Sequence, residues 1–487
     1  NFSKKNLFGP VLSKGSSINA RIKFLLFLGF GIFLLNYFKI SNPTYNHKVL
    51  AFLILLFSAL PAFLYIGDKQ NKIPFLPLFG VIYGIYYALP VFLLEFYKLH
   101  YKLGKKHILS DLLVEEALYL ALIGLIVLLV SYYIFPGRVL ERVIPRISIR
   151  WNLKKARIAS VMMGVIGIAV YYFDITHRVP THLSIIVQFI ANFSFVSIAM
   201  FLILQFKGVT GFMEKFFFWC IIIPLRVFLG LSTGSIYSGL AVVLLFFLIY
   251  ISHKKAIPWL LIILFVLTLL SLTAVKDDFR KLARSGEFEQ KSVLEKALIF
   301  GNMNLKFVQN AQRIKQSEFF QKFTTRTNGL MTLAYVIKKT PEVIPYWNGY
   351  SYIPLLTKFI PRIIYPDKPQ ENVGHIFGKR YNILHKSDKG TSVNLHQLVE
   401  MYANYGKTGV ILGMFFLGII YKALIVMLGY EENGDGSNLI GFVIFLPLLW
   451  IESNLSMIVG GIFYQIILLI ILNKMIAQKE IPETGIL

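Results

Sequence analysis

The sequence predicts an all-α polytopic membrane protein with about 12 transmembrane helices and a large, mainly helical extracytoplasmic segment before the last three spans. Apolar residues make up 56% of the 487-residue chain and charged residues only 15%, whereas about 25% of the residues in soluble domains are charged. Apolar runs of about 20 residues, the length of a helix that crosses a bilayer core, recur along the chain. Basic residues gather between these runs, which is typical of topology signals rather than of nucleic-acid binding, although the formal net charge is +25.

The apolar runs give the predicted spans in chain order. They lie at residues 23–39, 48–66, 75–96, 113–135, 157–174, 183–205, 213–232, 235–252, 257–275, 409–429, 438–452 and 455–476. The stretches 213–252 and 438–476 also fit a tight hairpin or a re-entrant pair, which would change the count by about one or two. The single cysteine, Cys220, lies inside an apolar run, so no disulfide can form within the chain.

The basic linkers set the expected orientation. The densest one carries seven Lys and Arg residues between Arg138 and Arg157 and is expected to stay in the cytoplasm. The basic N-terminus and segments 68–72, 207–215, 253–255 and 474–479 fall on the same side, and only segment 98–107 is basic on the other side. We therefore expect a multi-pass protein of the cytoplasmic (inner) membrane, with both termini cytoplasmic and the large segment periplasmic or extracellular.

The chain divides into three parts: residues 1–275 with nine spans, the extracytoplasmic segment 276–407, and residues 408–487 with the last three spans. The middle part carries 21 Lys and Arg against 11 Asp and Glu. Long loops translocate largely regardless of charge, so this excess is compatible with the orientation. It suits binding of anionic lipid head groups or lipid-linked phosphates, and it fits equally a solvated loop with a general attraction to anionic lipids.

The large segment is expected to be mostly helical. Residues 279–325 are rich in Lys, Glu, Gln, Ala and Leu and predict two short helices that are broken near Gly301-Asn302. Residues 327–339 predict an amphipathic helix that ends before Pro341. Residues 341–390 carry many Pro and Gly and predict irregular backbone, where binding groups are often placed. Helix is expected again over residues 392–406, which lead into the tenth span.

Four polar residues of this last helix are spaced to share one face: His396, Glu400, Asn404 and Lys407. Leu395, Leu398, Val399, Met401 and Tyr402 occupy its other faces. An ionisable pair four residues apart near the membrane surface can supply a general base above a lipid-anchored substrate. The alternative is a solvent-exposed face with a weak contact between His396 and Glu400.

Several stretches of the large segment carry a family resemblance: residues 347–352 (WNGYSY), 359–369 (FIPRIIYPDKP), Thr391-Ser392, 400–406 (EMYANYG) and Gly409. They are similar to the region before the final spans of Wzy-type O-antigen polymerases and related oligosaccharide repeat-unit polymerases. Tyr405 stands where that family usually has Phe in its Glu-x-Tyr-x-Asn-Phe-Gly pattern. Arg326 and the turn Thr340-Pro341 also fit the family's spacing, so the motifs cover about residues 280–418.

The resemblance implies a glycosyltransferase of polysaccharide and lipopolysaccharide biosynthesis in the cell envelope. Such an enzyme joins undecaprenyl-pyrophosphate-linked oligosaccharide repeat units at the outer face of the cytoplasmic membrane. A sugar hydroxyl attacks the anomeric carbon of the growing chain, and undecaprenyl pyrophosphate leaves. Either basic side chains or a divalent metal can stabilise this leaving group, and we favour a metal-independent mechanism without a cofactor. The implied partners are the lipid-linked oligosaccharide, membrane lipids, a flippase and a chain-length regulator, and no nucleic acid.

Candidate residues follow from this chemistry. Glu400 is expected to be the catalytic base in preference to His396, because the family pattern falls on Glu400, and Glu452 is a weaker alternative. The catalytic cations are expected to be Arg280, Arg326 and Arg362. The substrate-binding residues are expected to be Arg226, Lys368, Tyr402 and Asn404. The pair Asp277-Asp278 is expected to mark a helix entrance rather than a metal site.

Each cation also has a structural interpretation. For Arg280, Arg326, Arg362 and Lys368 the alternative is a surface residue or a contact to lipid head groups. Arg226 lies inside an apolar run, where an arginine is a functional candidate, although a side chain that reaches the interface is the alternative.

Three other functions share parts of this pattern. A ligase of the O-antigen type has the same topology, outer loop and basic residues, and the sequence separates it poorly from a polymerase. A polysaccharide or lipid-linked-sugar transporter is less favoured, because transporters usually show repeated halves and short loops, whereas this chain has no internal repeat. A membrane-embedded scaffold would leave no recognisable sequence pattern.

Overall fold

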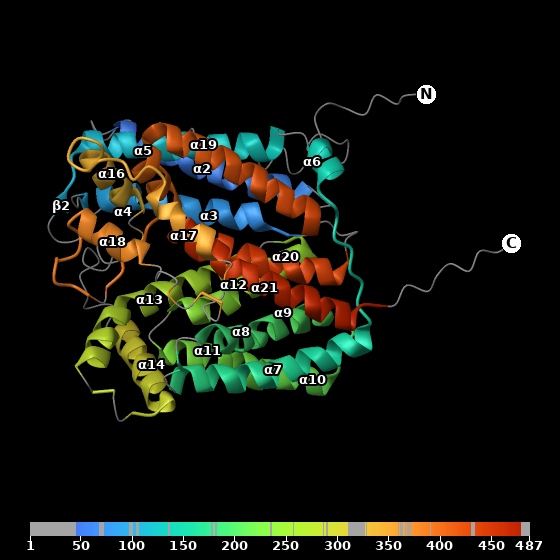
Figure 1. Cartoon of the computed structure of the whole chain (residues 1–487). Helices are drawn as coiled ribbons and strands as arrows, with labels where there is room; N and C mark the ends of the chain where they lie inside the picture. The colour runs from blue at the N-terminus through green and yellow to red at the C-terminus, as the bar shows by residue number, and fades with distance from the viewer. Residues whose placement is uncertain are drawn as a thin grey trace, which may run out of the picture.

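The computed structural model is a helical bundle whose long helices run back and forth along one direction (Figure 1). The structure describes residues 45–67, 73–96, 101–103, 107–134, 137–176, 179–180, 183–233, 236–256, 258–285, 287–288, 291–309, 327, 329–358, 360, 364–365, 367, 372–389, 391–429 and 434–478. The predicted first span, residues 23–39, lies outside these residues.

Eight helical stretches among the described residues are long and apolar enough to cross a membrane. They comprise α2 (Tyr45–Gly67), α3 with α4 (Phe75–Tyr87 and Leu89–Phe96), α5 (Asp111–Ile134), α7 (Leu153–Thr176), α8 with α9 (Ser184–Ala191 and Phe193–Phe206), α10 with α11 (Phe212–Phe217 and Ile223–Ser232), α19 (Gln397–Leu428) and α21 (Leu455–Ile476). The shorter α20 (Asp435–Leu448) is also apolar, as is most of α12 (Ile236–Lys254). The prediction of an all-α, membrane-embedded protein is therefore confirmed.

The helices pack in two groups. In the first, α19 packs along α5, and α2 packs against α3 and α5. In the second, α7 packs against α9, and α12 packs against α9 and α11. Helix α20 contacts both α19 and α9, so it lies between the groups, as Figure 1 shows. In the described part of the uncertain stretch 213–252, α10 runs through a π-helical turn into α11, and α11 packs against α12.

The two ends of the bundle differ. At one end, the loop end, lie the short strands β1 (Lys102–Leu103) and β2 (His107–Ile108), with α16 (Gly329–Lys339) and α18 (Val373–Arg380) (Figure 1). Between α16 and α18 in the chain, η4 (Tyr350–Tyr352) and α17 (Ile353–Lys358) pack against α21. At the other end, the strap end, lie α6 (Gly137–Val143) and the extended residues 144–152, which we call the strap. Much of the described part of the predicted extracytoplasmic segment therefore lies at the loop end.

The first part of the large segment is a helical hairpin. Helix α13 (Trp259–Arg284) continues nine residues past the expected boundary at residue 275, and α14 (Val293–Gln309) packs against it. Asp277 and Asp278 lie within α13 rather than at a helix entrance, and Asp278 pairs with Lys281 at 2.8 Å. The hairpin has its own small apolar core, which includes Phe279, Phe288 and Phe300.

The predicted helix break near Gly301-Asn302 is wrong, because α14 runs through both residues. Phe300, which is buried against Phe279, holds this part of the helix on α13. The chain instead breaks before α14, where the Ser292 amide and hydroxyl both donate to the Glu295 carboxylate and the Glu295 amide donates back to the Ser292 hydroxyl. This reciprocal pair is a capping box, and its Ser-x-x-Glu pattern marks the true start of the helix.

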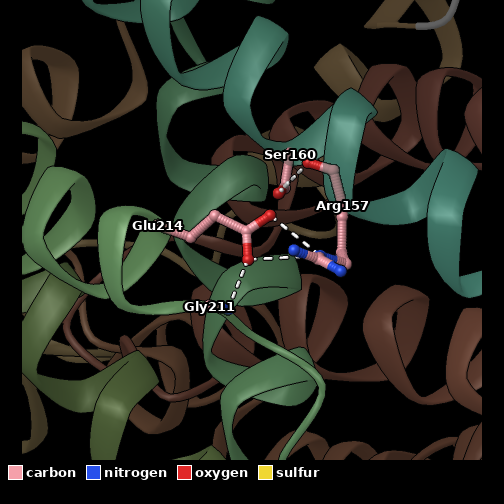
Figure 2. Close-up of polar contacts among 4 residues, drawn as sticks. All are labelled: Arg157, Ser160, Gly211 and Glu214. Carbon is pink, nitrogen blue, oxygen red and sulfur yellow. Dashed lines mark hydrogen bonds and ion pairs between the residues drawn. The ribbon is translucent and has the colours of Figure 1, made fainter.

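The turn before α10 (Phe212–Phe217) is fixed by an ion pair to α7, which Figure 2 shows. The Arg157 Nε donates to both carboxylate oxygens of Glu214, at 2.9 and 3.2 Å. Glu214 also accepts a hydrogen bond from the Gly211 amide at 2.7 Å, and the Ser160 hydroxyl donates to the Arg157 carbonyl. One carboxylate therefore caps α10 and ties it to the start of α7.

The orientation of the bundle can be tested by cysteine labelling in intact cells. The background is Cys220→Ser, because Cys220 is exposed and free. Ser387 lies exposed at the loop end and Ser148 lies exposed on the strap. We expect a membrane-impermeant maleimide to label Ser387→Cys in intact cells, and Ser148→Cys only after permeabilisation. The opposite pattern would invert the topology.

Candidate functional site

The candidate site lies where the first two turns of α19 meet the loop at residues 347–352. The Trp347 amide donates to the Ala403 carbonyl at 2.9 Å, and the Asn348 amide donates to the Asn404 carbonyl at 3.3 Å. In an uninterrupted helix these two carbonyls would accept from residues 407 and 408. Because they bind the loop instead, α19 is kinked at Tyr405 and Gly406, where its backbone leaves the helical region.

Asn404 joins three elements of the site. Its Nδ2 donates to the Ser351 hydroxyl and to the Glu400 carbonyl, both at 2.8 Å, and its Oδ1 accepts from the Gly349 amide at 2.8 Å. The side chain is completely buried. Both the donor and the acceptor of its amide are therefore used, which fixes the amide orientation and holds the loop against the helix.

Two glycines allow this close approach. Gly349 has a φ of +88° and Gly406 a φ of +63°, both in the left-handed region that favours glycine. A Cβ on Gly349 would lie 2.6 Å from Tyr405 Oη, and a Cβ on Gly406 would lie 2.7 Å from Tyr346 Oη. Larger residues at either position would push the loop away from α19.

Glu400 is the central carboxylate of the site. It is 1% exposed, and its Oε2 accepts from the Leu455 amide at 2.8 Å, at the first residue of α21. A helix N-terminus carries partial positive charge and favours a carboxylate there. The other oxygen, Oε1, has no hydrogen-bond partner among the residues that the structure describes. Glu400 is thus a fixed, buried carboxylate, and the Ser351 hydroxyl also lies close to it.

Tyr352 lies near this carboxylate. Burial, and then the negative charge of Glu400, raise the pKa of Tyr352 well above its ordinary value. The phenol therefore keeps its proton at neutral pH and can act as a hydrogen-bond donor, but not as a base.

His396 is completely buried one turn before Glu400. Its ring meets the edge of Tyr86 at a centroid distance of 5.3 Å, and the Tyr86 hydroxyl donates to Glu452 Oε2 at 2.8 Å. The alternative of a solvent-exposed face is therefore wrong, because His396, Glu400 and Asn404 all pack inside the protein. Glu452, the weaker candidate base, is held by Tyr86.

The prediction that Lys407 shares the face of Glu400 is wrong. The kink at Gly406 turns the rest of α19, so Lys407 is exposed and its Nζ pairs with Glu116 of α5 at 2.7 Å. Tyr402 also points elsewhere: its hydroxyl makes a long 3.5 Å hydrogen bond to the Thr340 carbonyl. Thr340 in turn contacts Tyr381 at 2.7 Å, so Tyr402 belongs to contacts that hold α16.

Arg226 forms a separate feature on α11 (Ile223–Ser232), directly after the π-helical turn η2 (Phe218–Ile222). The side chain is 8% exposed, and its guanidinium lies 3.8 Å from the centre of the Tyr171 ring on α7. Among the described residues, neither Nε nor Nη1 has a hydrogen-bond partner. A buried cation with unused donors is costly unless an anion binds it, and π-helical turns are frequent at functional sites.

The structure does not bring Arg226 next to Glu400. Helix α11 packs against α7, α12 and α14, whereas α19 packs against α5, α16 and α20. Arg280 is exposed near the end of α13. Arg326, Arg362 and Lys368 lie outside the described residues. Within the described residues, no group of three or more His, Cys, Asp and Glu side chains could hold a metal ion.

Sequence reasoning missed the groups that hold Glu400 and Asn404. Ser351 lies in a stretch that carries the family resemblance, but the sequence gave it no role. Leu455 contributes a backbone amide, for which its side chain carries no signal. The start of an apolar helix directly after Asn454 was the only indication that a helix N-terminus, and hence a favourable place for a carboxylate, lies there.

Residues 131–484 match the model of a protein family that is described as Domain of unknown function (DUF8712). The match covers more than half of the chain and includes α11 with Arg226 and α19 with Glu400. No curated protein and no solved structure matches the chain.

We expect Asn404→Ala to destabilise the protein, because it leaves the Gly349 amide without its buried acceptor. The free energy of unfolding should fall by about 1–3 kcal/mol, the usual cost of an unsatisfied buried group. The measurement is thermal unfolding of the detergent-solubilised protein. Asn394→Ala is the matched control, because Asn394 is exposed on the segment before α19. Equal melting temperatures for the two variants would contradict the role of Asn404.

Proposed function

This chain belongs to the DUF8712 family. From its candidate site we propose that it is a glycosyltransferase that joins undecaprenyl-pyrophosphate-linked oligosaccharide repeat units. The enzyme would be an O-antigen-like polysaccharide polymerase acting at the outer face of the cytoplasmic membrane. The loop end would then face outward. A flippase would supply its substrate, and a chain-length regulator would control its product.

One observation carries the proposal. Two stretches that resemble Wzy-type polymerases, residues 347–352 and 400–406, are about 50 residues apart in the sequence. They join through the backbone hydrogen bonds of Trp347 and Asn348 and through the side chain of Asn404. The second stretch contains Glu400, whose carboxylate lies at the N-terminus of α21.

The proposed chemistry assigns Glu400 the role of catalytic base. Its Oε1 would accept the proton of the attacking sugar hydroxyl while the hydroxyl oxygen bonds to the anomeric carbon. The bond from that carbon to the pyrophosphate oxygen breaks, and undecaprenyl pyrophosphate leaves with the bonding electrons. Asn404 would position Glu400 through its hydrogen bond to the Glu400 backbone carbonyl. The Leu455 amide would position the carboxylate through its hydrogen bond to Oε2. His396, buried beside Tyr86, would support this face of the helix.

The leaving group carries several negative charges and needs cations. We propose Arg280, Arg326 and Arg362 for this role, with Lys368 as a further cation and no metal ion. Arg226 would bind a phosphate of the lipid-linked donor from within the membrane, since its buried guanidinium has unused donors and no ion pair among the described residues.

We expect Glu400→Gln to lower the rate of chain elongation by about 100-fold or more, the usual contribution of a general base. The assay uses purified protein in liposomes with a lipid-linked repeat unit and EDTA, and the products are separated by chain length. The amide can keep the hydrogen bond from Leu455, so the melting temperature should change little.

Glu342→Gln is the matched control, because Glu342 is an exposed carboxylate in the turn after α16. Full elongation by Glu400→Gln would remove Glu400 as the base. Activity of the wild type only after addition of a divalent cation would contradict the metal-independent mechanism. Transfer of a single glycan to a different acceptor, without elongation, would favour a ligase.

We expect Arg226→Gln to raise the KM for the lipid-linked donor by about tenfold or more, because one charge-assisted hydrogen bond contributes about 1.5–3 kcal/mol. Arg226→Lys keeps the charge, so its KM should lie between that of Arg226→Gln and that of the wild type. If Arg226 were a buried cation without a ligand, Arg226→Gln would instead raise the melting temperature and leave the KM unchanged.

A further inference from the structure

The strap, residues 144–152, closes the end of the bundle opposite to Glu400. Its backbone pairs with the ends of three helices: the Ile147 amide donates to the Met427 carbonyl of α19 at 3.1 Å, and the Asn152 amide donates to the Ile476 carbonyl of α21 at 2.9 Å. The Ile149 carbonyl accepts from the Gly436 amide of α20 at 2.9 Å. The strap thus satisfies terminal groups that these helices cannot pair internally.

From residue 146 to residue 152 the strap alternates strictly between its two faces. Ile147, Ile149 and Trp151 point toward the bundle, and the Trp151 indole donates to Asn473 at 2.7 Å. Arg146, Ser148 and Arg150 are exposed on the opposite face. This period of two is that of an extended chain, so the backbone pairing presents the arginines outward in fixed positions.

The neighbouring residues extend this basic surface. Arg142 at the end of α6, and Lys154 and Lys155 at the start of α7, are also exposed. Glu141 is the only acidic residue between positions 137 and 157. Two acidic residues elsewhere at this end are paired, Asp435 with Lys207 and Glu214 with Arg157. The surface therefore keeps a strong positive charge.

The same surface also exposes apolar side chains. Val139 and Val143 lie one turn apart on α6 and are 48% and 74% exposed. A soluble acidic partner or a nucleic acid would bind the arginines without needing these valines. A membrane interface accommodates both kinds of side chain, because the basic groups meet head groups while the apolar ones enter the acyl boundary.

We propose that α6 and the strap form a binding surface for anionic phospholipids of the leaflet at the strap end. Lipid phosphates bind Arg142, Arg146, Arg150, Lys154 and Lys155, and Val139 and Val143 insert between the lipids. Because the strap holds the ends of α19, α20 and α21, bound lipid fixes the helices that carry Glu400 and Leu455 at their other ends. The binding surface itself does not depend on the proposed glycosyl transfer.

The test measures binding of a fluorescent phosphatidylglycerol to the full chain in neutral detergent, with a fluorescent phosphatidylcholine as the comparison. The wild type should prefer phosphatidylglycerol. The triple variant Arg142→Gln, Arg150→Gln, Lys154→Gln should weaken that binding at least tenfold, because each basic residue near an anionic surface contributes about fivefold. Val139→Ser with Val143→Ser keeps the charge and should weaken binding severalfold.

The matched control is Lys338→Gln, Lys386→Gln, Lys389→Gln, which removes the same charge from exposed lysines at the loop end. It should bind phosphatidylglycerol as the wild type does. Equal weakening by both triple variants, or equal binding of the two lipids by the wild type, would overturn the proposal. Unchanged binding by the valine variant would also overturn it, since a purely electrostatic surface would fit an acidic macromolecule instead.

Discussion

The hydrogen bonds that the loop at residues 347–349 makes to the Ala403 and Asn404 carbonyls are the interaction on which the candidate site depends. They take two acceptors away from the α-helical pattern, and α19 is therefore kinked rather than straight. Residues before the kink face the interior and the start of α21, whereas Lys407 after it reaches α5. Without this kink, Glu400 and Lys407 would lie on one face.

The kink also explains why the surrounding residues are small or amide-bearing. Gly349 and Gly406 both have left-handed backbone conformations. A Cβ built on either glycine would lie within 3 Å of a tyrosine hydroxyl oxygen. Asn404 is completely buried there and has to satisfy both a donor and an acceptor. An aspartate of the same size could accept from Gly349 but could not donate to Ser351 and to the Glu400 carbonyl.

Much of the fold could be predicted from the sequence, because apolar runs of membrane length can hardly be anything other than membrane helices. Helix α16 ended before Pro341 as predicted, since proline cannot continue a helix. The break at Gly301 was wrong because a single exposed glycine costs only about 1 kcal/mol, less than the packing of Phe300 contributes. The capping box at Ser292 was the stronger local signal.

The site was less predictable for a physical reason. Glu400 and Asn404 stood out as polar residues at helical spacing, but the groups that orient them are a backbone amide, a serine hydroxyl and the N-terminus of another helix. Almost every residue type carries a backbone N–H, so a pattern of side chains does not predict which backbone donor binds a carboxylate.

The separation of Glu400 from Arg226 is compatible with glycosyl transfer between two lipid-linked chains. In a displacement at an anomeric carbon, the attacking hydroxyl and the departing phosphate lie on different sides of that carbon. A base for the hydroxyl and a cation for the phosphate should therefore come from different walls of the site. Here α19 and α11 belong to two packing groups joined by α20. The anomeric carbon is bonded directly to the pyrophosphate, so Glu400 and the cation at the adjacent phosphate would have to flank one and the same carbon. Arg226 on α11 would therefore fit the phosphate next to the polyprenyl chain better than the phosphate bonded to the sugar.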